Sequence, residues 1–304
     1  MGDLIELCDA RHRVRIAPAT GGGIADAVAL REGRSVPLLR PRGGAPTRAQ
    51  NGAAVDALGL GCNVLVPSCN RVSGGGFAFE GAFHHLAPNV DIAPYPIHGD
   101  GWLAVWRVAE KSAQAVTLNH DGHFGPFDYT ATLHYALDEG GILARLSVTN
   151  RGLRLPFGAG FHPWFQRLSG TRLRFQAAGV WTETEDYLPL RHLALSDHPD
   201  RSFCRSRALP QDFINAAFTG WPGAARIAQP GLGIEIDVTA SPNLGIAHVY
   251  SPGPNAGFFC FEPVSHATDA ANQPGLPGLT ILDSGANMTV WMRIAWRAVE
   301  GADA

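Results

Sequence analysis

Apolar and polar residues alternate along several segments of this chain, and this alternation restricts the fold more than any other feature. Apolar side chains occupy every second position over 133–137 and again over 142–148, with a glycine-containing break at 138–141. The pattern recurs over 232–238 and 288–296. Successive side chains of a β-strand point to opposite faces. Each segment therefore predicts a strand with one buried face, and the first two predict a β-hairpin.

Composition supports a fold of strands and turns. The 304 residues include 36 Gly and 22 Pro, only 17% are charged, and Lys111 is the single lysine. Long helices in soluble proteins are usually rich in lysine and glutamate, and here only 45–60 and 209–218 favour short helical turns. No composition break marks a linker. The sequence predicts one all-β domain over 1–304, a large antiparallel β-sandwich.

Charge and patterning argue against several kinds of partner. The net charge of -3, with scattered arginines, leaves no basic surface for nucleic acid or an anionic membrane. We see neither a secretory signal nor an apolar run of about 18 residues that could span a bilayer. Five widely spaced cysteines favour reduced thiols in a protein too large to need disulfides. We expect a cytoplasmic protein, either a monomer or a homodimer.

Four segments combine polar residues with glycine, proline and aromatic residues. In the third, His162 lies between Phe161 and Pro163, with Trp164 close behind. Such a histidine can exchange a proton near neutral pH or can be a core residue satisfied by backbone, and the local pattern leaves both open. The nearby aromatic rings could equally pack on the apolar face of a sugar. The four segments are 67–71, 96–99, 160–165 and 260–263.

Glu262 follows the apolar run 257–261 and precedes a proline. A carboxylate at the end of a buried strand is costly unless it is paired or used, so a general base and a structural ion pair are equally compatible. His98 and Arg71, taken alone, are weaker signals that also suit a turn histidine and a surface arginine.

Other kinds of site lack support. His120 and His123 have metal-like spacing, but we predict that they lie in a solvated Gly/Pro-rich turn without a third ligand. Cys62 and Cys69 have no second cysteine pair beside them. Nucleotide loops, dinucleotide fingerprints and a nucleophile elbow are absent from the sequence. We therefore expect neither a cofactor nor a metal.

Taken together and in order, the four segments resemble the aldose 1-epimerase (galactose mutarotase) family over most of the chain. The opening strands near 14–18 and 21–24 and the tail at 278–285 are similar as well. Trp164 stands where family members often carry tyrosine, and Cys69 falls in a motif that reads differently in the family. The motifs that carry the resemblance are Asn70-Arg71, Phe77-x-Phe79-x-Gly81, His98-Gly99, His162-Pro163-Trp164-Phe165, Asp212 within 211–218, and Glu262-Pro263.

The resemblance implies a β-supersandwich that interconverts the α and β anomers of a free sugar without a cofactor. If the family's catalytic roles apply to the matching residues of this chain, Glu262 removes the proton of the C1 hydroxyl and His162 protonates the ring oxygen. His98 would hydrogen-bond near that oxygen, while Arg71 and Asp212 would hold sugar hydroxyls. Ring opening needs one donor and one acceptor on the two oxygens of C1, which suits a carboxylate and an imidazole.

Three alternative functions make different demands on the same motifs. A hexose-6-phosphate 1-epimerase of the same superfamily would need arginines around a phosphate. A sugar-binding or sensor domain on the same sandwich would need no proton transfer, and a purely structural domain would leave the ordered motifs unexplained. We expect a small-molecule sugar substrate whose identity the sequence leaves open. The family motif would put Cys69 beside the pocket, where it could alter which sugar fits, and its role is left open as well.

Overall fold

The computed structural model describes residues 3–43, 47–48, 54–91 and 94–299. Within these ranges the regular structure consists of antiparallel strands and short 3-10 helices, and no helix there is long and apolar enough to cross a membrane. The 3-10 helices are η1 (Asp56–Gly59), η2 (Pro199–Arg201), η3 (Pro230–Leu232), η4 (Pro254–Ala256) and η5 (Ala270–Asn272).

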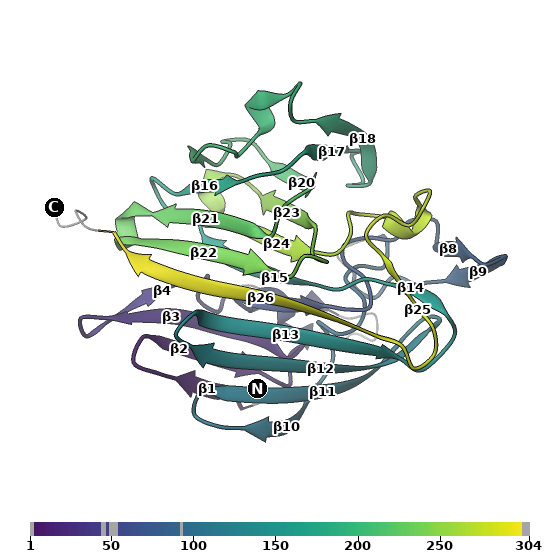
Figure 1. Ribbon diagram of the computed structural model, residues 1–304, viewed down its shortest axis with the longest axis horizontal. Coiled ribbons are helices and arrows are strands. Elements are labelled where there is room, and N and C mark those ends of the chain that lie inside the picture. The colour runs from purple at the N-terminus through teal and green to yellow at the C-terminus, as the bar shows by residue number, and fades with distance from the viewer. Residues whose placement is uncertain (1–2, 44–46, 49–53, 92–93, 300–304) are drawn as a thin grey trace.

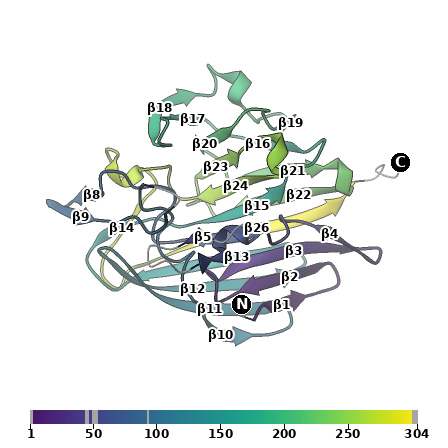
Figure 2. The same cartoon turned by 180° about the vertical axis from the view of Figure 1, so that it is seen from behind.

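An 11-stranded sheet forms one layer, seen behind in Figure 1 and in front in Figure 2. Several of its neighbouring strands are far apart in sequence, and its centre joins strands from the two halves of the chain. In spatial order the sheet contains β1 (Ile5–Cys8), β2 (His12–Ala17), β3 (Gly23–Arg31), β7 (Cys62–Leu65), β15 (Gly160–Gln166), β24 (Phe258–Val264), β23 (Ile246–Ser251), β20 (Ile214–Thr219), β17 (Gly179–Glu183) and β18 (Pro189–Ala194), with β4 (Arg34–Pro37) beside β3.

A nine-stranded sheet forms the second layer, in front in Figure 1. Its longest strands are the ones with the clearest alternation in the sequence. In spatial order it contains β10 (Arg107–Lys111), β11 (Ala115–Phe124), β12 (Phe127–Asp138), β13 (Gly141–Asn150), β26 (Asn287–Ala298), β22 (Ile234–Ala240), β21 (Ala224–Gln229), β16 (Arg172–Phe175) and β19 (Arg207–Ala208).

The main hydrophobic core is shared by the two sheets. Leu133, Leu146 and Val290 of the nine-stranded sheet belong to the same buried cluster as Phe161 and Phe259 of the 11-stranded sheet. Burying one face of each sheet against the other is the usual way for antiparallel sheets to remove apolar side chains from water. Three two-stranded sheets complete the fold: β5 (Thr47–Arg48) with β6 (Ala54–Val55), β8 (Gly76–Phe79) with β9 (Ala82–His85), and β14 (Leu155–Phe157) with β25 (Thr280–Leu282).

The structure confirms the all-β antiparallel prediction and most of the predicted strands. β12 and β13 pair through Asp138 and Gly141 as the predicted hairpin, and 288–296 lies inside β26. The strand expected from 232 starts two residues later, after η3. Within 45–60 the described residues include one helical turn, η1. The helical turn expected over 209–218 is wrong, because 214–219 pairs with β23 and sheet pairing outweighs a local preference.

The turn expected around His120 and His123 is also wrong, because both residues lie within β11. Three positions apart on a strand, they point to opposite faces. The side chain of His120 is mostly buried, with its Nε2 atom 3.4 Å from Asp100 Oδ2, whereas the side chain of His123 is 69% exposed. Their strand placement separates the two imidazoles and removes the basis for a shared metal.

Candidate active site

The outer face of the central strands carries the polar residues of the site. On β15 and β24 the core residues are Phe161, Phe165, Phe259 and Phe261. The alternate residues lie on the other face, where Phe258 packs against Trp164. Phe161 and Phe259 are fully buried between the sheets, whereas His162, Trp164 and Glu262 line a pocket on the other face. The period of two along each strand thus separates the packing residues from the residues available for chemistry.

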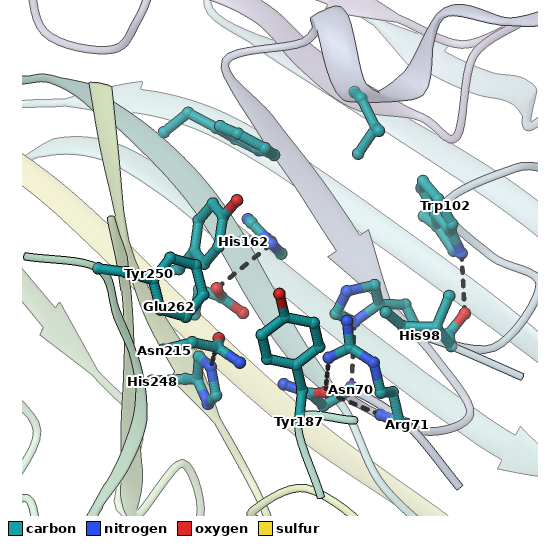
Figure 3. Close-up of a pocket in the computed structure, with 14 residues that line it drawn as sticks. Asn70, Arg71, His98, Trp102, His162, Tyr187, Asn215, His248, Tyr250 and Glu262 are labelled. Atoms are coloured by element: carbon teal, nitrogen blue, oxygen red, sulfur yellow. Dashed lines mark hydrogen bonds and ion pairs between the residues drawn. The ribbon is translucent and has the colours of Figure 1, made fainter. Parts of the chain in front are cut away.

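Strand register brings His162, Glu262 and His248 into one row across the sheet. The pairs Gly160–Val264 and Trp164–Cys260 between β15 and β24 bracket His162 and Glu262, and His248 pairs directly with Glu262 between β23 and β24. The Nε2 atom of His162 lies 3.3 Å from Oε1 of Glu262, as drawn in Figure 3. The His162 side chain is 12% exposed and the Glu262 side chain 3%. This pair is the polar centre of the pocket.

Loops from four parts of the chain surround this row. The pocket is a cavity of about 210 Å³ that opens to solvent. Aromatic rings supply much of the wall (Figure 3). The lining residues are Leu58, Asn70, Arg71, Ile97, His98, Trp102, His162, Trp164, Tyr187, Phe213, Asn215, His248, Tyr250 and Glu262.

The loop that carries His98 is held at both ends by hydrogen bonds and close backbone contact. Asn89 Nδ2 donates to the carbonyls of Ile97 and Gly99 at 2.8 and 2.6 Å, and Trp102 Nε1 donates to the same two carbonyls. Gly99 has a φ of 69°, and a Cβ atom there would lie 2.1 Å from the Val66 carbonyl oxygen. Only glycine fits this approach, which fixes the position of His98.

His98 is oriented by the backbone of the neighbouring loop. The Asn70 N–H donates to His98 Nδ1 at 3.0 Å, so in the neutral imidazole the proton is on Nε2, which is left as a donor. The ring stands edge-on to that of His162, with the centroids 5.4 Å apart. Burial keeps the pKa of His98 well below its ordinary value, and the proximity of His162 and Arg71 acts in the same direction.

Arg71 lines the same side of the pocket. Its Nη1 donates to Asn70 Oδ1 at 3.1 Å, and its guanidinium carbon lies 4.9 Å from the ring centroid of Tyr187. Asp269 anchors this loop: its backbone N–H donates to the Arg71 carbonyl, and its carboxylate accepts from the N–H and hydroxyl of Ser73. A guanidinium group presents several N–H donors in a fixed plane, so Arg71 can donate hydrogen bonds to a polar ligand.

Trp164 forms a rigid wall beside the pair of His162 and Glu262. Its ring stacks on that of His162 with the centroids 4.9 Å apart, and the guanidinium carbon of Arg40 lies 4.0 Å from the Trp164 ring centroid. Its Nε1 donates to Asn63 Oδ1, and Asn63 in turn donates to the carbonyl of Ala57. These contacts hold the imidazole of His162 in place from one side.

Burial controls the protonation of the central pair. It lowers the pKa of His162 to about 3, with His248 contributing in the same direction. Burial also raises the pKa of Glu262 well above its ordinary value, although the charge of Arg71 acts against this. Together these shifts favour an uncharged imidazole beside a protonated carboxyl. The Nδ1 atom of His162 has no hydrogen-bond partner among the described residues.

A hydrogen-bonded chain continues the row beyond His248. Asn215 Oδ1 lies 2.7 Å from His248 Nε2, and Asn215 Nδ2 donates to Glu183 Oε2 at 2.5 Å. Because Glu183 accepts from the amide nitrogen, the amide oxygen of Asn215 is the atom turned toward His248. Burial raises the pKa of Glu183 to about 8 and lowers that of His248 to about 3.

The structure brings together four of the five predicted site residues: His162, Glu262, Arg71 and His98. It does not place Asp212 with them. Asp212 is exposed in the bend before β20 and does not line the pocket, whereas Asn215, three residues later and inside the strand, does. Cys69 is buried, with its N–H donating to His266 Nε2, and does not line the pocket either.

Sequence reasoning missed His248, Tyr250, Asn215 and Trp102. His248 and Tyr250 had a detectable signal, because they occupy alternate positions of a short apolar segment that ends at Ser-Pro-Gly, residues 251–253. Asn215 and Trp102 had no comparable local signal, because what places them at the pocket is pairing with distant strands and packing of a loop.

One group of side chains could hold a metal ion. Among the described residues, His162, Cys260 and Glu262 each offer one ligand atom, and these atoms lie within 4.8 Å of one another. Burial, reinforced by Glu262, raises the pKa of the Cys260 thiol well above its ordinary value. Metals bind the thiolate rather than the thiol, so the donor set fits a metal poorly.

Fold and site together define an all-β protein with a buried carboxyl–imidazole pair in an aromatic, polar pocket. The chain belongs to the aldose 1-epimerase family, whose model matches residues 49–295. It is 35% identical over 271 residues to the uncharacterized protein YphB of Escherichia coli K12, covering 86% of this chain and 90% of that protein.

Solved structures agree with this membership. A candidate aldose 1-epimerase from Escherichia coli K12 superposes with a TM-score of 0.87 at 30% identity, over 98% of this chain and 99% of that one. A galactose mutarotase-like protein from Clostridium acetobutylicum gives a TM-score of 0.82 over 97% and 95% of the two chains. At 16% identity the second likeness concerns the fold alone.

Proposed function

We propose that this protein is an aldose 1-epimerase that interconverts the α and β anomers of a free aldose. The observation that carries the proposal is the His162–Glu262 pair, 3.3 Å apart at the buried centre of the pocket. A carboxyl and an imidazole side by side can accept and donate a proton on the two oxygens of one anomeric carbon. Membership of the aldose 1-epimerase family supports the same reaction class.

The reaction proceeds in two mirrored halves. Glu262 takes the proton of the C1 hydroxyl, the bond between C1 and the ring oxygen breaks, and the ring oxygen takes a proton from His162. The resulting aldehyde rotates about the C1–C2 bond. On reclosure the ring hydroxyl returns its proton to His162 and the carbonyl oxygen takes one from Glu262, so no net proton is consumed.

The protonation of the His162–Glu262 pair is compatible with this cycle. A protonated carboxyl beside a neutral imidazole holds the same number of protons as a carboxylate beside an imidazolium. Moving one proton between Glu262 and His162 therefore produces the reactive state without exchange with solvent. The positive charge of Arg71, which acts on Glu262, favours the carboxylate.

A neutral sugar suits the pocket better than a sugar phosphate. Arg71 is the only arginine among the lining residues, and it already contacts the Asn70 side chain and the Tyr187 ring. Phosphate recognition generally uses several charged or bidentate contacts. Arg71, His98 and Asn215 instead offer hydrogen bonds to hydroxyl groups.

Pure anomers of hexoses and pentoses, followed by polarimetry or proton NMR against the uncatalysed rate, test the proposal. We expect faster anomer exchange with free aldoses, including after dialysis against a chelator. A kcat/KM for a hexose 6-phosphate 100-fold above that for the free hexose would favour the phosphate branch. Binding without any exchange would instead indicate a sugar sensor, and loss of activity on dialysis that a divalent ion restores would indicate a metal enzyme.

A further inference from the structure

A row of aromatic rings leads from the reacting pair to the mouth of the pocket. Tyr250 pairs with Cys260 in the sheet, beside Glu262. Its ring centroid lies 5.8 Å from that of Phe213, which lies 5.7 Å from that of Tyr187. The outer two rings remain in contact with water: Phe213 is 48% exposed and Tyr187 39%. We call Tyr187, Phe213 and Tyr250 the aromatic rim, and Figure 3 shows both tyrosines facing the pocket.

The backbone at Tyr187 indicates that its ring is held in place. Tyr187 lies in the loop between β17 and β18 with a φ of 61°, a left-handed conformation that is unfavourable for a large side chain. Its N–H donates to the Thr184 carbonyl at 3.0 Å, and the Arg71 guanidinium packs on its ring. Such local strain persists where surrounding contacts over-determine it, and it is frequent at ligand sites.

The chemistry of the rim fits a neutral, ring-shaped ligand. Exposed aromatic rings at a pocket mouth gain free energy when an apolar surface covers them. The carbon-bound hydrogens of a pyranose ring form such a surface, while the tyrosine hydroxyls can bond its oxygens. The spacing of successive rim rings is on the scale of one sugar ring, and the rim itself contributes no cation that would select a phosphate.

We propose that the aromatic rim is a second sugar subsite, which holds the non-reducing ring of a reducing disaccharide. This inference rests on the proposed function, because the reducing ring, which alone can open, would lie over His162 and Glu262. The second ring undergoes no chemistry. It adds binding free energy against Phe213 and Tyr187, so the preferred substrates are reducing disaccharides rather than single sugars.

The test compares kcat/KM for cellobiose, maltose and lactose with that for glucose and galactose. In the wild-type protein we expect at least one disaccharide to exceed its reducing-end monosaccharide by about 10-fold. Phe213→Ala should reduce this ratio by about 10-fold, mainly through KM, and Tyr187→Leu should reduce it in the same direction. Phe83→Ala is the matched control, because Phe83 is 49% exposed on β9 and does not line the pocket.

The outcomes distinguish failure of the rim subsite from failure of the proposed function. An unchanged disaccharide-to-monosaccharide ratio in Phe213→Ala, or a wild-type protein that excludes all three disaccharides, overturns the rim subsite while leaving the epimerase proposal intact. Absence of anomer exchange with every sugar overturns the proposed function. In that case calorimetric titration of cellobiose and glucose into wild-type and Phe213→Ala protein still tests the rim, since equal affinities of both proteins for cellobiose would refute it.

Discussion

Replacing Glu262 by glutamine separates catalysis from structure at the centre of the pocket. The amide keeps the size and the hydrogen-bonding capacity of the side chain, and it cannot take a proton. If Glu262 is the base, kcat should fall by about 10² to 10⁴, equivalent to roughly 3–5 kcal/mol of barrier. Sugar affinity should change much less, because the amide still bonds the C1 hydroxyl.

The same substitution should stabilise the fold at neutral and alkaline pH. Burial raises the pKa of Glu262 in the folded protein well above the ordinary 4.5. The folded state therefore binds this proton more tightly than the unfolded chain, and wild-type stability declines as pH rises above about 4.5 until the folded pKa is reached. The uncharged amide avoids this decline. The stability difference should grow by up to about 1.4 kcal/mol per pH unit across that window.

Urea denaturation between pH 5 and 8, combined with sugar titration and anomer exchange by NMR, measures all three effects on one variant. Glu110→Gln is the control, because Glu110 is exposed on β10 and should alter none of them. A structural ion pair predicts the opposite pattern, with a loss of about 3–5 kcal/mol of stability and near-normal turnover. That pattern would refute our interpretation of Glu262.

Two further predictions concern neighbours of Glu262. His162→Asn removes the donor to the ring oxygen without emptying the pocket, so anomer exchange should fall by about 10² to 10⁴ while the circular dichroism spectrum is retained; normal exchange would exclude His162 as the acid. Glu183 has a pKa raised to about 8 by burial, so it should lower the stability of the wild-type protein as pH rises from about 4.5 to 8. In Glu183→Gln the melting temperature should therefore fall less between pH 4.5 and 8 than in the wild-type protein. The same dependence of melting temperature on pH in both proteins would show that Glu183 is ionised in the folded state.

Much of the fold follows from local sequence, because the alternation of side chains is a property of each strand alone. The hairpin of β12 and β13 and the last strand, β26, could be predicted in this way. The phenylalanines flanking His162 and Glu262 also mark the face that packs into the core, which leaves the two polar side chains on the opposite face.

Only the tertiary structure determines which of these strand faces come together. Nothing in the local sequence places His248 opposite Glu262, and the choice between Asp212 and Asn215 depended on where β20 begins and which strand it pairs with. The alanines of 214–219 favour a helix locally, yet pairing with β23 makes this segment a strand. Hydrogen-bond register between strands far apart in the chain sets these neighbours, and a shift of one residue would turn each side chain to the other face.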